Sequence, residues 1–271
     1  MVLIEKLEKR INEYRCDNIF KNLFLCFTKN YFECKCNEKH NFIKEEMHYA
    51  IELEIKDKKN IYESLNLLID KESLDDENRI FCPKCWYKIN MYKYTKFKLI
   101  PKFLIFVLKR FEFSELYLTY NKIYDYFEFP DILDMSKYLE TNNNTNINCK
   151  YNLYGVIIHK GFFYSGHYYY ILNDIYNNVW IKFDDSKVDI IDEKEAKNQF
   201  FGSKNIGNNL ENIPTSYLLI YKKIDYTNAE KANYNNIKEL IEVVSNNEKK
   251  ENIIDIYGNN NIMCEKTYNN K

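Results

Sequence analysis

The sequence lacks three features: an overall positive charge, a long apolar run and a recognisable signal peptide. It contains 39 Lys and Arg against 40 Asp and Glu, a formal net charge of −1, so it has no overall basic field that would attract nucleic acid or an anionic membrane. The apolar runs, such as residues 103–108, are far shorter than the roughly 20 residues that a membrane-spanning helix needs. The first ten residues mix charged and apolar side chains, so no signal peptide is predicted.

Cysteine, glycine and proline are also scarce. Eight Cys are too few for a disulfide scaffold in 271 residues, so we expect reduced thiols or metal ligands in a reducing compartment, the cytoplasm or the nucleus. Six Gly and four Pro are few for this length and carry no functional message. In contrast, 45% of the residues are hydrophobic and 17% are aromatic, enough for a substantial core. The sequence therefore predicts a globular protein.

Hydrophobic spacing predicts a mixed organisation of helices and strands. Residues 2–11 and 60–69 have apolar residues at helical spacing, whereas residues 48–56 alternate like a half-buried strand. The run FLIFVLKRF from residue 103 predicts a strand buried on both faces, and we expect it at the centre of a sheet. Aromatic and β-branched runs between residues 151 and 222 predict an antiparallel sheet.

Two polar segments are predicted to lie outside the packed core. Residues 142–148 are nearly all Asn and Thr, which cannot bury apolar surface, so we interpret them as an exposed loop or insertion. Residues 224–271 are rich in Asn, Lys and Glu and are predicted to form a polar, partly disordered tail.

Two close pairs of cysteines indicate a metal site. The pair CKC at residues 34–36 and the pair CPKC at residues 82–85 would bring together four thiolates, the soft tetrahedral ligand set of a structural Zn²⁺ ion. The four predicted ligands are Cys34, Cys36, Cys82 and Cys85. Cys26 or His40 could replace one of them, and the alternative interpretation is four reduced thiols. Such a closed site would stabilise the fold and would not catalyse a reaction.

One histidine has a context that suggests catalysis. His167 follows a segment bounded by Gly161 and Gly166 and begins a predicted strand, and Asp184 ends the next predicted strand. An Asp in this place can fix the tautomer and orientation of the imidazole, which gives two members of a nucleophile, base and orienting triad. On residue types alone, a His among aromatic residues is more often a hydrogen-bonded structural residue.

The ordered motifs of the chain resemble those of the ubiquitin-specific protease family of cysteine deubiquitinases. The motifs are CKC, CPKC, LIPKFLIFVLKRFEF, YFEFP, YSGHYYYI, WIKFDDSKV and YLLIYKK, and the resemblance runs from about residue 2 to residue 223. It implies an α+β, papain-like fold with fingers and palm, rich in antiparallel strands, in which most of the α-helical thumb is missing. The implied partial catalytic domain is residues 1–223, with zinc-binding fingers at about 30–95 and the palm at about 96–223.

The resemblance also assigns roles to single residues. His167 corresponds to the general base, Asp184 to its orienting partner and Asp185 to an assisting carboxylate. Gly161, Gly166 and Tyr168 correspond to the substrate-binding loop and its edge, which in the family closes over the C-terminal tail of ubiquitin. The four cysteines correspond to the zinc positions, where CxC departs from the commoner CxxC.

The largest departure concerns the nucleophile. The family's nucleophile lies in a Gly- and Asn-containing Cys box, and residues 2–10 resemble the helix that comes after it, so we expect the nucleophilic Cys upstream of this chain. Cys16 and Cys26 lack the Gly-flanked helix N-terminus that would lower a thiol pKa. The chain alone is therefore expected to be inactive.

The resemblance implies a deubiquitinase, which hydrolyses the peptide or isopeptide bond after the C-terminal Gly of ubiquitin in a thiol-dependent reaction. The expected partners are ubiquitin or ubiquitinated proteins, with neither nucleic acid nor membrane, and zinc is the expected structural cofactor. The alternative is a catalytically inactive ubiquitin-binding module or scaffold, in the case that the chain is complete. A zinc ribbon that recruits nucleic acid is disfavoured by the near-neutral charge.

Overall fold

A computed structural model describes Lys6, Arg10 and residues 17–35, 40–116, 118–140, 149–175, 177–203 and 210–224. The chain divides into two units, residues 1–226 and 227–271, and the described residues lie in the first. Lys6 and Arg10 are helical, but the rest of the helix predicted at residues 2–11 lies outside the described residues. Cys16, Cys36, residues 142–148 and the tail from residue 225 also lie outside them.

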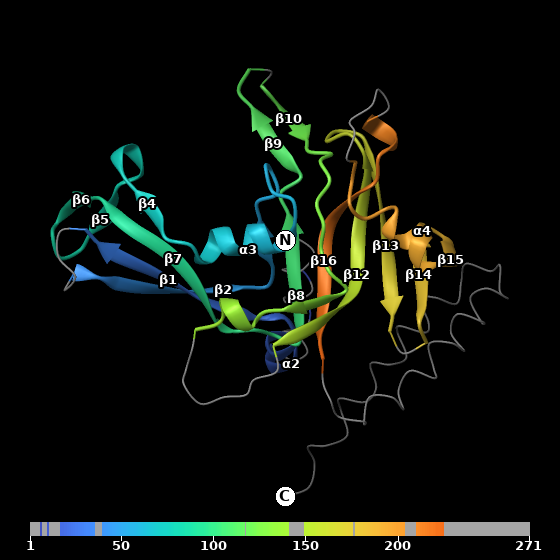
Figure 1. Cartoon of the computed structure of the whole chain (residues 1–271), viewed down its shortest axis with the longest axis horizontal. Helices are drawn as coiled ribbons and strands as arrows, with labels where there is room; N and C mark the ends of the chain where they lie inside the picture. The colour runs from blue at the N-terminus through green and yellow to red at the C-terminus, as the bar shows by residue number, and fades with distance from the viewer. Residues whose placement is uncertain are drawn as a thin grey trace, which may run out of the picture. The chain divides into compact units, whose positions relative to one another are not determined.

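The first sheet has four strands in the order β2-β1-β7-β4 (Figure 1). Helix α2 (Asp17–Phe24) leads into β1 (Cys26–Cys34), which pairs with β2 (Phe42–His48) and β7 (Met91–Leu99), and β4 (Glu72–Leu74) pairs with β7. Every second residue of β1 is buried, as expected for a strand with one face on a core. After β4, η2 (Asp76–Asn78) leads to the hairpin of β5 (Ile80–Cys82) and β6 (Tyr87–Ile89). A small separate core lies here, formed by Phe32, Cys34, Leu74, Cys82, Ile89 and Met91.

The second sheet is larger and has the order β15-β14-β13-β12-β16-β8-β3, with β11 paired to β12. Its strands are β3 (Ile51–Leu53), β8 (Phe103–Leu108), β11 (Ile132–Asp134), β12 (Lys150–Gly161), β13 (Gly166–Asp174), β14 (Val179–Asp184), β15 (Lys187–Ile191) and β16 (Thr215–Lys223). All neighbours pair antiparallel except β3 and β8. The antiparallel sheet predicted for residues 151–222 is therefore present.

The shorter elements surround this sheet. They are α3 (Ile61–Ile69), η3 (Ser136–Tyr138), α4 (Glu193–Lys197), η4 (Leu210–Asn212) and the hairpin of β9 (Phe111–Ser114) and β10 (Thr119–Lys122). Among the described residues, no helix is long and apolar enough to cross a membrane.

Helix α3 packs where the two sheets meet (Figure 1). It begins after Asn60, whose side chain accepts a hydrogen bond from the backbone N–H of Glu63 and so caps the helix. Its buried residues Ile61 and Leu65 join the main core together with Leu53 of β3. These residues fall within the segment of about 30–95 predicted as fingers, and the bounds of that segment stay a prediction.

Strand β8 confirms that residues 103–108 form a buried strand, but it does not lie at the centre of the sheet. It is the second strand from the edge, between β16 and β3. Helix α2 also contacts it. The apolar run therefore indicates that both faces of the strand are buried. Burial of both faces does not determine where a strand lies in the order of the sheet.

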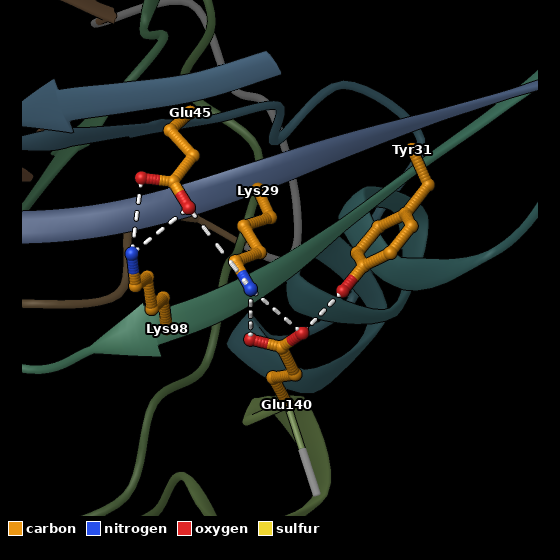
Figure 2. A network of polar contacts seen from close by, with 5 residues as sticks. All are labelled: Lys29, Tyr31, Glu45, Lys98 and Glu140. Atoms are coloured by element: carbon orange, nitrogen blue, oxygen red, sulfur yellow. Dashed lines mark hydrogen bonds and ion pairs between the residues drawn. The ribbon is translucent and has the colours of Figure 1, made fainter. Parts of the chain in front are cut away.

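A polar network joins the first sheet to the residue that precedes the Asn-rich insertion (Figure 2). Glu140 accepts hydrogen bonds from Nζ of Lys29 at 2.9 Å and from the hydroxyl of Tyr31 at 2.6 Å. Beside it, Nζ of Lys98 lies 2.8 Å from Glu45. Lys29 and then Tyr31 hold the pKa of Glu140 below its usual range. The network thus ties β1, β2 and β7 to a segment that is distant in sequence.

Candidate functional site

His167 and Asp184 lie on neighbouring strands of the second sheet and contact each other. His167 is the second residue of β13, and Asp184 is the last residue of β14. Nε2 of His167 lies 2.5 Å from Oδ1 of Asp184. The His167 side chain is 46% exposed and the Asp184 side chain 26% exposed, so the pair is open to solvent. Because Asp184 occupies Nε2, Nδ1 is the ring nitrogen left to accept a proton from another group.

Lys182 extends this pair to a chain of three polar residues. It lies two residues before Asp184 on β14, and alternate residues of a strand point to the same face. Its Nζ lies 2.8 Å from Oδ2 of Asp184 and 4.4 Å from the centre of the Tyr169 ring. Lys182 first, and His167 second, hold the pKa of Asp184 below its usual range. An ionised carboxylate can orient the imidazole and stabilise its protonated form.

Asp185 lies beside the pair in the tight turn between β14 and β15. Its backbone has a φ of 53°, in the left-handed region, and its side chain is exposed. One oxygen or nitrogen atom of each of His167, Asp184 and Asp185 lies within 4.8 Å of the other two. Among the described contacts His167 is hydrogen-bonded to Asp184 and not to Asp185, so the assisting role of Asp185 stays a prediction.

The segment before His167 is a short hairpin loop between β12 and β13. Gly161 and Gly166 pair at its base, and the backbone N–H of Phe162 donates to the carbonyl of Ser165 at 2.9 Å. Gly161 has a φ of 109°, and a Cβ there would lie 2.5 Å from the Ser165 carbonyl oxygen. Both features require glycine at the base of the loop.

Gly166 is glycine for a different reason. A Cβ at this position would lie 1.9 Å from Nε2 of His159, whose ring is buried under the strand. Glycine is therefore required here because the His159 side chain approaches the backbone of Gly166 closely. The predicted role of Gly166 in binding substrate stays a prediction.

Tyr168 was predicted to bind substrate, and it lies on the opposite face of β13 from His167. Its ring centre is 4.5 Å from that of His159 and 5.5 Å from that of Tyr217. The side chain is 48% exposed. The structure thus separates Tyr168 from the His167–Asp184 pair.

Sequence reasoning missed two lysines near the site. Lys182 could have been found from the alternation along β14, since it precedes Asp184 by two residues. Lys122, at the end of β10, is buried and donates to the carbonyls of His159 and Gly161. Nothing in the sequence distinguishes it from the other lysines.

Three of the four predicted metal ligands, Cys34, Cys82 and Cys85, lie at one end of the first sheet and beside it. One ligand atom of each of Cys34, His40 and Cys85 lies within 4.8 Å of the other two, and Nδ1 of His40 is 2.9 Å from Sγ of Cys85. Sγ of Cys82 accepts a hydrogen bond from the backbone N–H of Cys85 at 3.4 Å. His40, considered from the sequence as a substitute ligand, is therefore part of the cluster, while Cys36 lies outside the described residues.

The local turns explain why these thiols meet. The side chain of Asn41 accepts from the backbone N–H of Cys34 at 2.8 Å, across the ends of β1 and β2. The backbone N–H of Trp86 donates to the Cys82 carbonyl at 2.9 Å and closes the CPKC turn. Thiolates and an imidazole nitrogen at these separations suit a tetrahedral zinc ion. The donor set of Cys34, His40 and Cys85, with Cys82 beside Cys85, therefore fits a zinc ion.

No cysteine among the described residues hydrogen-bonds to His167. Cys26 lies in the main core, 1% exposed, and its Sγ donates to the Leu99 carbonyl. Burial raises the pKa of this thiol to about 12, the reverse of what a nucleophile needs. Burial of Cys26 thus disfavours it as a nucleophile, and it does not belong to the group of Cys34, His40 and Cys85.

The sequence profile of the family described as "Ubiquitin carboxyl-terminal hydrolase" matches residues 1–221. Ubiquitin carboxyl-terminal hydrolase 5 of Schizosaccharomyces pombe is 29% identical over 231 residues, which cover 83% of this chain and 21% of the relative. Ubiquitin carboxyl-terminal hydrolase 34 of Homo sapiens is 28% identical over 259 residues, covering 82% of this chain and 7% of the relative. This chain thus spans about a fifth or less of the length of these relatives.

Two solved structures of a DUB module are similar to this chain in fold and sequence. A chain of the SAGA Ubp8/Sgf11/Sus1/Sgf73 DUB module bound to ubiquitin aldehyde has a TM-score of 0.62 and 28% sequence identity. The match covers 80% of this chain and 45% of that chain. The yeast SAGA DUB module with a mutant Sgf73 gives the same TM-score, identity and coverage.

Proposed function

Since this chain belongs to the ubiquitin carboxyl-terminal hydrolase family, within the ubiquitin-specific protease type, we propose that it carries the general base and the orienting carboxylate of a thiol-dependent deubiquitinase. The observation that carries the proposal is the bond between Nε2 of His167 and Asp184, which leaves Nδ1 for the proton of a thiol. The bond to be cleaved is the peptide or isopeptide bond after the C-terminal Gly of ubiquitin. Binding of ubiquitin aldehyde by the similar DUB module supports ubiquitin as the partner.

The nucleophile in this proposal is a cysteine N-terminal to the residues of this chain. His167 takes the thiol proton on Nδ1, and the thiolate attacks the carbonyl carbon of the C-terminal Gly. Asp184 holds the imidazole and stabilises the imidazolium, which then gives its proton to the leaving amine. Water, deprotonated by His167, hydrolyses the thioester and regenerates the thiol.

The zinc ion is proposed to be structural. Cys34, His40 and Cys85 would hold it, with Cys82 or Cys36 as the fourth ligand, and a closed set of four leaves no position for a substrate. It would tie the ends of β1 and β2 to the β5–β6 hairpin. We place the protein in the cytoplasm or the nucleus, where thiols stay reduced.

The test compares the protein purified from its own cells with the present chain. The intact mass is measured first, and both proteins are then incubated with ubiquitin that carries a fluorogenic C-terminal amide. We expect a native mass above 33.0 kDa and cleavage by the native protein. The present chain should bind ubiquitin without cleaving it. In the native protein, His167→Ala should abolish cleavage and preserve ubiquitin binding.

The other outcomes are distinct. A native mass of 33.0 kDa with binding but no cleavage would favour the inactive ubiquitin-binding module. Cleavage by the present chain would place the nucleophile among its own cysteines, of which Cys16 would be the first to substitute. Normal turnover by the His167→Ala protein would remove this residue from the mechanism.

A further inference from the structure

Lys122 is a buried cation without a carboxylate partner. It is 9% exposed, and it forms no ion pair within the part of the chain that the structure describes. Burial first, and the nearby buried Arg110 second, lower its pKa to about 7. Lysine is rarely buried in this way, because its charge loses hydration. The burial of Lys122 despite this loss of hydration suggests that its side chain has a specific structural role.

The ammonium group contacts the end of strand β12. Nζ donates to the carbonyl oxygen of His159 at 2.9 Å and to that of Gly161 at 3.2 Å. The hydroxyl of Tyr124 donates to the same Gly161 oxygen at 3.1 Å, and Nζ lies 4.7 Å from the centre of the Tyr124 ring. Hydrogen bonds from a charged donor are stronger than those between neutral groups. Lys122 and Tyr124 therefore hold the last residues of strand β12, which precede the loop of residues 162–165.

This loop adjoins the candidate base. Gly161 pairs with Gly166 across the hairpin, and Lys160 pairs with His167. On its other side, the loop rests on the β9–β10 hairpin, since the rings of Phe163 and Tyr120 stack with centres 4.7 Å apart. A cavity of about 500 Å³ lies between the loop and the hairpin. The backbone that Lys122 holds is the end of β12, which leads into the loop and pairs with the start of β13.

We propose that Lys122 is a positioning residue, which holds the loop of residues 162–165 in the place where the C-terminal tail of ubiquitin must pass to reach His167. The part that concerns ubiquitin rests on the proposed function, in which the C-terminal tail reaches His167 beside the loop that adjoins it. Lys122 itself does not contact the reacting atoms. It acts through the carbonyl groups of His159 and Gly161.

The experiment measures the binding of two ligands, intact ubiquitin and ubiquitin that lacks its C-terminal tail, to the full chain by calorimetry. Lys122→Met removes the donor and the charge. Lys160→Met is the matched control, since it removes a lysine from an exposed side chain next to the same loop. We expect Lys122→Met to weaken the binding of intact ubiquitin about tenfold, as for the loss of one charge-assisted hydrogen bond. Binding of the tail-less ubiquitin and both affinities of Lys160→Met should stay unchanged.

Equal weakening for the two ligands would overturn the proposal, because a general structural defect does not distinguish them. An unchanged affinity for intact ubiquitin would also overturn it. Tyr124→Phe serves if Lys122→Met does not fold, because it deletes only one hydrogen bond to Gly161 and should show the same selectivity to a smaller extent.

Hydrogen exchange separates this proposal from the function itself. The Phe162 amide, which is bonded to Ser165, should exchange faster in Lys122→Met and in Tyr124→Phe, while amides of β14 keep their rates. If the unaltered chain binds neither ligand, the ubiquitin function fails, and the exchange rates decide alone whether Lys122 holds the loop. Equal rates in all proteins would overturn it.

Discussion

The thiol cluster and the His167–Asp184 pair are both built at the ends of strands, yet they differ in their surroundings. Cys34 and Cys82 are buried in a small core of their own, whereas His167 and Asp184 lie at an open edge of the large sheet. A closed donor set can retain an ion and stabilise a fold, but it admits no substrate. An exposed imidazole with one nitrogen occupied can exchange a proton with a ligand. The comparison thus sets the proposed structural site against the proposed chemical one.

The largest expected effect concerns the closed site. Cys85→Ala should release the zinc and lower the melting temperature by roughly 10 °C, because the metal links hairpins that share only a small core. Metal analysis and a melting curve check this. Cys26→Ala is the control, since it removes a more deeply buried thiol from the other core and should leave the proposed zinc bound. If the unaltered protein and Cys85→Ala are both free of metal and melt at the same temperature, the distinction between the two sites is lost.

The open site should respond in activity and not in stability. In the native protein, Asp184→Asn should lower kcat about 100-fold or more, because an amide cannot stabilise the imidazolium, and melting should change little. Turnover and melting of the same preparation check both parts. Asp185→Asn should have a smaller effect, since Asp185 forms no hydrogen bond to His167. A reversed order of the two effects would assign the orienting role to Asp185.

A third change refines the electrostatics of the open site. Lys182 is the main cause of the lowered pKa of Asp184, so Lys182→Met should raise that pKa. The ionised form of Asp184 exists above its pKa and is lost as the pH falls, so the acid limb of the pH–activity profile should move to higher pH. Carboxylate NMR titration of the present chain gives the same answer without turnover. Lys187→Met is the control, because Lys187 lies opposite Asp184 in the hairpin without forming an ion pair with it.

The smallest effect is expected in the polar network of Figure 2. Glu140→Gln should cost about 1 kcal/mol of unfolding free energy, because the partners are partly exposed. The pKa of Glu140 is lowered in the folded chain, so the difference from the unaltered chain is fully present above the unfolded pKa and is lost as the pH falls through the lower folded pKa. Urea unfolding at neutral and acid pH checks this. A loss as large as that of Cys85→Ala would mean that ion pairs, and not metal, stabilise the first sheet.

Much of the fold could be predicted because its signals are local. The cap at Asn60 and the spacing of Ile61 and Leu65 specify α3 without reference to the rest of the chain. The place of α3 in the main core depends on β3 pairing with β8, which are about fifty residues apart, and no local pattern encodes that contact. For the same reason, the burial of β8 was predicted correctly, whereas its predicted position at the centre of the sheet was wrong.

The contacts of the candidate sites could likewise be predicted where they join neighbouring elements and not where they join distant ones. The pair of His167 and Asp184 follows from a strand, a turn and a second strand, which bring the two residues together through neighbouring elements. His40 joins Cys85 across 45 residues, and its contact depends on the pairing of β1 with β7. Lys122 shows the limit most clearly, since a buried lysine has the same sequence signature as an exposed one.

The anchoring of Glu140 has a practical consequence for protein engineering. Its backbone N–H donates to the Phe97 carbonyl, and the carbonyl of Cys149, on the other side of residues 141–148, accepts from Met135. Both points of attachment are thus held by main-chain bonds that do not depend on the residues between them. Lengthening a chain segment between fixed ends costs little entropy. A reporter domain inserted between residues 140 and 149 would therefore leave both sheets intact and mark the protein for imaging in living cells.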